Sequence, residues 1–316
     1  VILYGSSRAA FGLSPATTGK LLGCADCVYN GALTGGHMTA LTAYLDHRLE
    51  HGPPLETVVW GIDFFAFDEG TTLPPIFTRD RLNSFGLSPY DAMFTTIAGT
   101  TLVNSVWTVA ANLAPVRASQ PYFDNGQLTA NEMSSQVARE GMRARFRQSL
   151  DLYMNGRFRA YEPSDRAWRE FGKALSELRR RDINVLIFVP PTHVAHLEAI
   201  RLRGLWPRWI DFKRRLAQHT SYWDFSGVNP VTTEQIADEM SFYWDISHFR
   251  TRVGDRILTQ LFDNKAPENG QPRFGKHVTK QTVAQGLAEE KEALARWREQ
   301  HPSQAAFVNR QLSKAQ

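Results

Sequence analysis

Short, continuous apolar runs alternate with helix-like stretches along most of this 316-residue chain. Five runs read as strands: Val1–Tyr4, Cys27–Asn30, Thr57–Gly61, Asn184–Val189 and Ser221–Phe225. A strand whose hydrophobicity is continuous rather than alternating is typical of a parallel sheet that helices cover on both faces. We therefore expect a three-layer α/β/α protein with a mainly parallel, five-stranded sheet.

The alternation of strands and helices breaks between residues 65 and 162. About 100 residues between two strands exceed an ordinary crossover connection. This stretch holds an apolar segment, Ile97–Leu113, and a charged helical pattern around Asn131–Met154. We expect a single α/β domain over 1–263 that carries this helical insertion, which could form a lid or a substrate wall. A polar C-terminal extension containing a helix should follow over 264–316.

Composition narrows the class of partner. With 36 Lys and Arg against 32 Asp and Glu, the net charge is only +4. The densest basic clusters, Arg143–Arg147 and Arg179–Arg181, have acidic residues nearby, which favours solvated helix faces over a nucleic-acid surface. No apolar run approaches the ~20 residues that a membrane-spanning helix needs. We expect neither a nucleic-acid partner nor a transmembrane helix within these residues.

The two cysteines, Cys24 and Cys27, form a C-x-x-C pair. A zinc site would need two further ligands, and no second pair supplies them, so we expect no metal and no cofactor. Cys27 leads into an apolar stretch, whereas a redox motif normally opens a helix. The pair is interpreted as structural, or as a disulfide if the protein is secreted.

Two short motifs at opposite ends of the chain suggest catalysis. Ser7 lies in the turn after the first strand, at the carboxyl edge where open α/β folds place their sites. Near the other end, Asp245 precedes His248 by three residues, so its carboxylate can orient the imidazole while the other ring nitrogen takes a proton from a hydroxyl. Alone, each motif is more simply a turn or a helix cap. Together they predict a Ser-His-Asp triad, and the absence of a G-x-S-x-G elbow disfavours the ordinary α/β-hydrolase.

These blocks resemble those of the SGNH (GDSL-type) hydrolase superfamily, over roughly 1–63 and 183–262. Gly5-Ser6-Ser7 is similar to the G-D-S block, with Ser6 in place of Asp, and implies that Ser7 is the nucleophile. The segment Asn30–Gly35 is loosely similar to N-x-G-x-S-G and implies an oxyanion hole made by the amides of Ser7 and Gly35. The D-x-x-H block is matched by Asp245 and His248.

The third block of the superfamily, G-x-N-D, is matched by Gly61-Ile62-Asp63-Phe64. Asp63 thus stands where the resemblance implies an Asn that donates to the oxyanion. An ionised carboxylate there would repel the developing negative charge. Asp63 should therefore be protonated, point elsewhere, or alter catalysis.

The runs V-I-L-Y-G-S-S-R-A-A-F-G-L-S-P, V-V-W-G-I-D-F-F and Y-W-D-I-S-H-F-R resemble a bacterial branch of this superfamily. It includes the alginate O-acetylation proteins, DltD of teichoic-acid alanylation, and related polysaccharide acetylation proteins. The resemblance implies serine-dependent O-acetyl transfer, or ester hydrolysis, on a cell-surface or exopolysaccharide glycan. It also implies an acyl donor supplied by a membrane-bound acyltransferase, a periplasmic or cell-surface location, and a membrane anchor upstream of Val1.

Three residues are candidates for substrate binding. Arg8 could hold an anionic group or form a salt bridge, and His193 follows the fourth strand at the edge where the site is expected. Trp244 could stack on a sugar ring or belong to the core. Asp224 is an alternative carboxylate for the triad, or a turn residue. The leading alternative function is a catalytically impaired, SGNH-like glycan-binding or scaffold subunit, which Asp63 and the missing Asp of the first block favour.

Overall fold

The computed structural model describes residues 1–71, 77, 82, 89, 93, 99–113, 121–263 and 274–312. Its sheet has the strand order β2-β1-β3-β4-β5-β6, in which β1 to β5 are parallel and β6 is antiparallel to β5. The strands are β1 (Ile2–Tyr4), β2 (Tyr29–Asn30), β3 (Thr57–Gly61), β4 (Asn184–Val189), β5 (Tyr222–Asp224) and β6 (Lys276–Val278). The prediction of an α/β protein with a mainly parallel sheet is confirmed.

The expected number of strands was one too low. The five predicted strands all form, but β6 adds a sixth at the edge of the sheet. Only Val278 of its three residues is buried, so β6 carries none of the apolar continuity that marks a central strand. Its antiparallel direction needs no helical crossover from β5.

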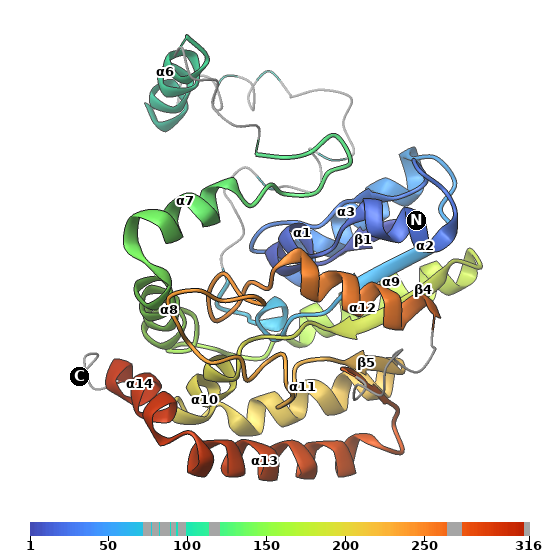
Figure 1. Cartoon of the computed structure of the whole chain (residues 1–316). Helices are drawn as coiled ribbons and strands as arrows, with labels where there is room; N and C mark the ends of the chain where they lie inside the picture. Colours follow the sequence, from blue (N-terminus) through green and yellow to red (C-terminus); the bar gives the residue numbers. More distant parts are fainter. Residues whose placement is uncertain are drawn as a thin grey trace.

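The chain forms helices between and after these strands (Figure 1). They are α1 (Ser7–Gly12), α2 (Pro15–Leu22), α3 (Met38–His51), the 3₁₀ turn η1 (Phe64–Phe67), α6 (Gly99–Leu113), α7 (Asn131–Glu140), α8 (Met142–Asp151), the π-helix η2 (Leu152–Arg157), α9 (Asp165–Arg180), α10 (Val194–Leu202), α11 (Trp206–His219), α12 (Thr251–Asp263), α13 (Val283–Gln300) and α14 (Pro302–Leu312). Helices α1 and α2 pack against α12, and α3 packs against α9.

The crossing of α1 and α12 brings the two ends of the chain together. A side chain at Gly12 would overlap the ring of Phe249, and a side chain at Gly254 would overlap the carbonyl oxygen of Gly12. Glycine at both positions therefore permits a close helix contact. This contact places the start of α1 beside the loop that precedes α12.

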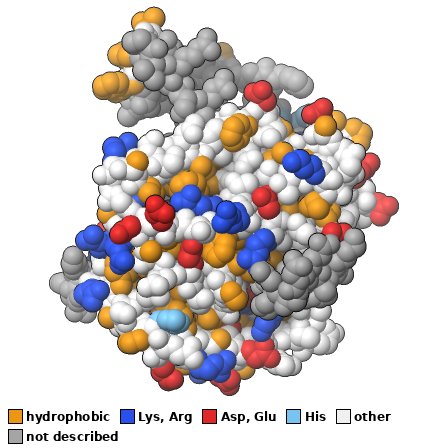
Figure 2. Space-filling view, in the orientation of Figure 1, with side chains coloured by type: hydrophobic (Ala, Val, Ile, Leu, Met, Phe, Trp, Pro, Cys, Tyr) orange, Lys and Arg blue, Asp and Glu red, His pale blue; other side chains and the backbone are white. Residues whose placement is uncertain are grey.

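The insertion divides into two parts. Helices α8 and η2 pack against α10 and α14, and Phe146 and Met154 of this part are fully buried. Helix α6 instead exposes its large apolar side chains: Leu102, Val103, Val106, Trp107, Val109 and Leu113 are each more than half exposed (Figure 2). Much of the predicted lid or wall lies outside the described residues. In the described ranges, no helix combines the length and the apolarity needed to cross a membrane.

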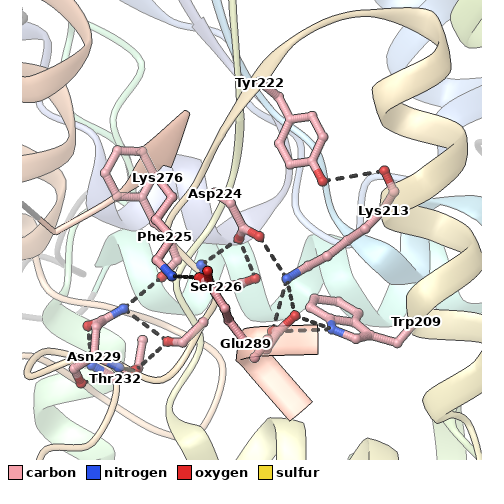
Figure 3. A network of polar contacts seen from close by, with 12 residues as sticks. Trp209, Lys213, Tyr222, Asp224, Phe225, Ser226, Asn229, Thr232, Lys276 and Glu289 are labelled. Atoms are coloured by element: carbon pink, nitrogen blue, oxygen red, sulfur yellow. Dashed lines mark hydrogen bonds and ion pairs between the residues drawn. The ribbon is translucent and has the colours of Figure 1, made fainter. Parts of the chain in front are cut away.

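The C-terminal extension joins the body of the protein through a buried ion cluster. The Lys213 ammonium on α11 lies 2.8 Å from Asp224 Oδ2, at the end of β5 (Figure 3). It also lies 2.7 Å from Glu290 Oε2 on α13. Burial acts to lower the pKa of Lys213, but the two carboxylates outweigh it and raise that pKa. Trp209 Nε1 also donates to Glu290. Residues 274–312 thus add a strand and two packed helices beyond the predicted boundary at residue 263.

Candidate active site

Ser7, His248 and Asp245 come together in one hydrogen-bonded row. Ser7 Oγ lies 2.9 Å from His248 Nε2, and His248 Nδ1 lies 2.8 Å from Asp245 Oδ2. The side chain of His248 remains 18% exposed, whereas that of Asp245 is buried at 3%. The imidazole is therefore reachable from solvent while the carboxylate behind it is not. This is the geometry of a nucleophile, a general base and the group that orients the base.

The ionisation of Asp245 fixes the tautomer of His248. Burial alone would raise the pKa of Asp245, but His248 and the amides of Ser247 and His248 outweigh burial and lower it to about 2. Those amides donate to Asp245 Oδ1 at 2.7 and 2.9 Å. An ionised carboxylate only accepts, so Nδ1 carries the imidazole proton. Nε2 is then free to accept the hydroxyl proton of Ser7.

The turn that carries Ser7 explains its departure from the G-D-S pattern. Gly5 has φ of +141°, and a side chain there would lie 2.8 Å from the carbonyl oxygen of Gly61 on β3, so only glycine fits. Ser6 is the N-cap of α1, and its Oγ accepts from the Arg8 amide at 3.3 Å. Ser6 thus fills a capping role that suits Ser as well as Asp. Ser7 is the first residue of α1, where backbone N–H groups have no intrahelical partner.

Gly35 lies in the loop after β2, which runs beside the Ser7 turn. Leu33 N donates to Gly5 O at 2.9 Å, and Gly36 N donates to Leu33 O at 3.1 Å, so the loop is tied to the start of the Ser7 turn. Gly35 itself is exposed and has φ of +65°. Asn30 supports the same loop, because its amide nitrogen donates to Ala9 O on α1 at 3.0 Å. The loop that carries Gly35 is therefore held beside Gly5, two residues before Ser7.

Asp63 is turned toward Arg8. The two side chains form an ion pair in which both are almost fully buried, and Asp63 Oδ1 accepts from the Arg8 guanidinium. Burial works to lower the pKa of Arg8, but Asp63 and Tyr153 raise it overall. Of the three expectations for Asp63, this geometry favours the second, a carboxylate that points elsewhere. Arg8, predicted to bind an anionic substrate group or to form a salt bridge, forms the salt bridge.

Arg8 also contacts the loop that holds Asp245 and His248. Its Nε donates to Ser247 Oγ at 3.1 Å, and one terminal nitrogen lies 3.4 Å from the Tyr153 hydroxyl. That nitrogen also lies 3.3 Å from His196 Nε2. Burial, and next the nearby Arg8, lower the pKa of His196 far below its ordinary value. A neutral His196 can accept from the guanidinium, which only donates.

The insertion contributes two residues that sequence reasoning missed. Tyr153 of η2 places its hydroxyl 2.8 Å from Ser247 Oγ, and Arg145 of α8 lies 3.6 Å from Asp245 Oδ2. No local motif marks either residue, because both reach the site only through tertiary packing. Part of the insertion therefore packs against the loop that holds Asp245 and Ser247.

The remaining sequence candidates lie around this centre rather than in it. His193 is fully buried; Ala195 N donates to its Nδ1, and its Nε2 lies 2.6 Å from Glu234 O, so neither nitrogen is left for a substrate. Trp244 is half-buried beside the catalytic loop, with Arg250 Cζ 3.6 Å from the centre of its ring. Asp224 binds Lys213 and Ser226, so the geometry favours Asp245 as the triad acid.

No described group of His, Cys, Asp and Glu side chains is arranged to hold a metal ion. Cys24 and Cys27 form a disulfide in the segment between α2 and β2. In comparisons with known proteins, no family model and no curated sequence matches the chain. The assignment of chemistry therefore depends on the geometry of the site and on the sequence motifs.

Proposed function

We propose that this chain is a serine-dependent carbohydrate O-acyltransferase or esterase of the SGNH type, acting through an acyl-enzyme. The observation that carries the proposal is the row Ser7, His248, Asp245, with separations of 2.9 and 2.8 Å. The parallel strand order β2-β1-β3-β4-β5 and the position of Ser7 directly after β1 also support it. This is the order of flavodoxin-like three-layer folds, in which sites form at the carboxyl edge of the sheet.

In the proposed reaction, His248 Nε2 takes the proton of Ser7 Oγ as that oxygen attacks the carbonyl carbon of an acyl ester. The amides of Ser7 and Gly35 would stabilise the negative charge on the carbonyl oxygen. When the ester bond breaks, His248 returns the proton to the departing alcohol, leaving an acyl group on Ser7. Water or a sugar hydroxyl then gives its proton to His248 as its oxygen attacks the acyl carbon. When the bond to Ser7 breaks, His248 passes that proton to Ser7 Oγ, and the acyl group leaves on the acceptor. Only this acceptor distinguishes an esterase from a transferase.

The proposed substrate is a cell-surface or exopolysaccharide glycan, and the proposed acyl group is acetyl. We base both on the sequence resemblance, along with a membrane-bound acyltransferase as donor and an anchoring segment upstream of Val1. A periplasmic or cell-surface location agrees with the Cys24–Cys27 disulfide, because such bonds persist in oxidising compartments.

A catalytically impaired glycan-binding or scaffold subunit is the alternative function. The observation that favours it is the ion pair of Asp63 with Arg8, which removes the side-chain donor that the superfamily places in the oxyanion hole. Loss of one such donor lowers kcat by about 10²–10³ in serine hydrolases without abolishing the reaction. The pair is therefore compatible with slow turnover as well as with none.

Turnover of a chromogenic acetyl ester by wild type and by Ser7→Ala separates these functions. We expect wild-type hydrolysis that the substitution reduces by at least about 10⁴-fold. Undiminished hydrolysis in Ser7→Ala would exclude the nucleophile. No hydrolysis by wild type, together with glycan binding that Ser7→Ala retains, would favour the scaffold.

A further inference from the structure

Arg8 connects the two halves of the candidate active site. It follows Ser7 directly on α1 and is only 3% exposed. One side of its guanidinium pairs with Asp63 after β3, while its Nε donates to Ser247 Oγ, 239 residues further along the chain. Arg8, the residue after Ser7, therefore holds the loop that carries His248 through a hydrogen bond.

Ser247 is the residue through which this hydrogen bond can affect His248, because it lies between Asp245 and His248. Its amide donates to Asp245 Oδ1 at 2.7 Å, and its hydroxyl is held by Arg8 and by Tyr153. The loop is thus fixed through both its backbone and a side chain. A loop held in this way presents His248 at a defined distance from Ser7.

We propose that Arg8 is a positioning residue that sets the distance and orientation of His248 relative to Ser7, with Asp63 as its buried counter-ion. The inference rests on the proposed function of the triad. It gives Asp63 a role other than oxyanion binding: the carboxylate neutralises and orients the guanidinium. A misplacement of about 1 Å can lower the rate about 10²-fold, so this role should affect turnover.

A salt bridge that only stabilises the fold would behave differently under substitution. Replacing a buried ion pair by neutral residues is often harmless to stability, whereas removing one partner leaves a buried charge. Arg8→Met combined with Asp63→Asn removes both charges and the donor to Ser247. Ser247→Ala removes the other end of the same hydrogen bond and leaves the ion pair intact.

The test measures kcat, KM and melting temperature with a chromogenic acetyl ester for wild type, the neutral double variant, Ser247→Ala, and the triple combination. We expect near-wild-type melting of the double variant, kcat lower by about 10²-fold, and KM changed by only a few fold. Ser247→Ala should lower kcat similarly, and the triple variant should lose little more, because all act through one contact. Wild-type kcat in the double variant, or losses that multiply, would overturn the proposal.

Two further measurements keep the result decisive. If the double variant does not fold, Arg8→Lys retains the charge beside Asp63 but not the fork geometry. It should then lower kcat as Ser247→Ala does, and wild-type kcat in both would count against positioning. The proton NMR signal of the His248 Nδ1 proton needs no turnover. It should be sharp in wild type and broadened in Ser247→Ala; an unchanged signal would contradict positioning, even if wild type proved inactive.

Discussion

The protein contains two buried ion clusters that differ in how completely their polar atoms are paired. In the cluster of Lys213, Asp224 and Glu290, the ammonium donates to both carboxylates and Asp224 Oδ1 also accepts from Ser226. No polar atom of that cluster is left without a partner. Beside Arg8, by contrast, Asp63 Oδ2 and His196 Nδ1 are buried without a hydrogen-bond partner among the described residues.

This difference coincides with a difference in position, because only the incompletely paired cluster contacts the proposed active site, through Ser247. Buried polar groups in folded proteins are nearly always paired, and the exceptions gather where function constrains the sequence. The paired cluster joins β5 to the C-terminal helix α13, far along the sheet from Ser7. The incompletely paired cluster contacts Ser247, which lies between Asp245 and His248. We therefore expect substitutions in the first to change stability and substitutions around the second to change turnover.

The largest contrast should come from two aspartates, Asp245 in the loop before α12 and Asp224 at the end of β5. Asp245→Asn should lower kcat about 10⁴-fold, because an amide favours the wrong tautomer of His248. Asp224→Asn should leave kcat within about twofold and lower the melting temperature, since Lys213 loses a charged partner. Ester hydrolysis and thermal unfolding of both variants check this. A reversed pattern would mean that the roles of the two carboxylates have been exchanged.

Removal of the buried ammonium should have the next largest effect. Lys213→Met leaves Asp224 and Glu290 buried without their cation, which should lower the free energy of unfolding by about 3–5 kcal/mol. The matched control is Lys276→Met: its ion pair with Glu289 is exposed, so its loss should change stability much less. Denaturant titration measures both. Equal effects would show that burial of the cluster does not matter.

As the pH falls, proton uptake by His193 in the unfolded chain should lower the stability of the fold before protonation of Asp245 does. Burial lowers the pKa of His193 to about 4, so the unfolded chain takes up a proton below about pH 6.5 that the folded protein does not. Stability should fall by about 3 kcal/mol as the pH drops from 6.5 to 4. Because the pKa of Asp245 is lowered to about 2, its contribution to folding stability is lost only as the pH falls from about 4 toward 2.

Denaturant unfolding between pH 7 and pH 4, repeated on His193→Gln, checks this order. Gln at position 193 cannot titrate, so the variant should show a shallower loss over that interval. An identical slope would place the titrating group elsewhere.

The smallest expected effect concerns two helix caps. Ser6→Ala and Ser14→Ala each remove an N-cap, of α1 and α2, and each should lower stability by about 1 kcal/mol. Only Ser6 adjoins the nucleophile, so only Ser6→Ala should also lower kcat. Equal kcat values for the two variants would show that the Ser7 turn does not depend on its cap.

Features that depend on residues close together in the sequence could be predicted, whereas contacts between distant residues could not. Strands β3 and β4 have the predicted bounds, because long apolar runs define them locally. The triad was also accessible, since Asp245 and His248 form one motif. The partners of Arg8 were not: Asp63 lies 55 residues away and Ser247 lies 239 away, and no periodicity reports such pairing. The same holds for Arg145, which reaches Asp245 from the insertion.

In the proposed reaction, Ser7 forms a covalent acyl intermediate with the help of His248. Intact mass spectrometry after brief exposure to an activated acetyl ester tests it most directly, with Ser7→Ala treated in parallel. Wild type should gain the mass of one acetyl group, and Ser7→Ala should gain none. Ester turnover without any adduct on wild type, or an equal adduct on Ser7→Ala, would contradict it.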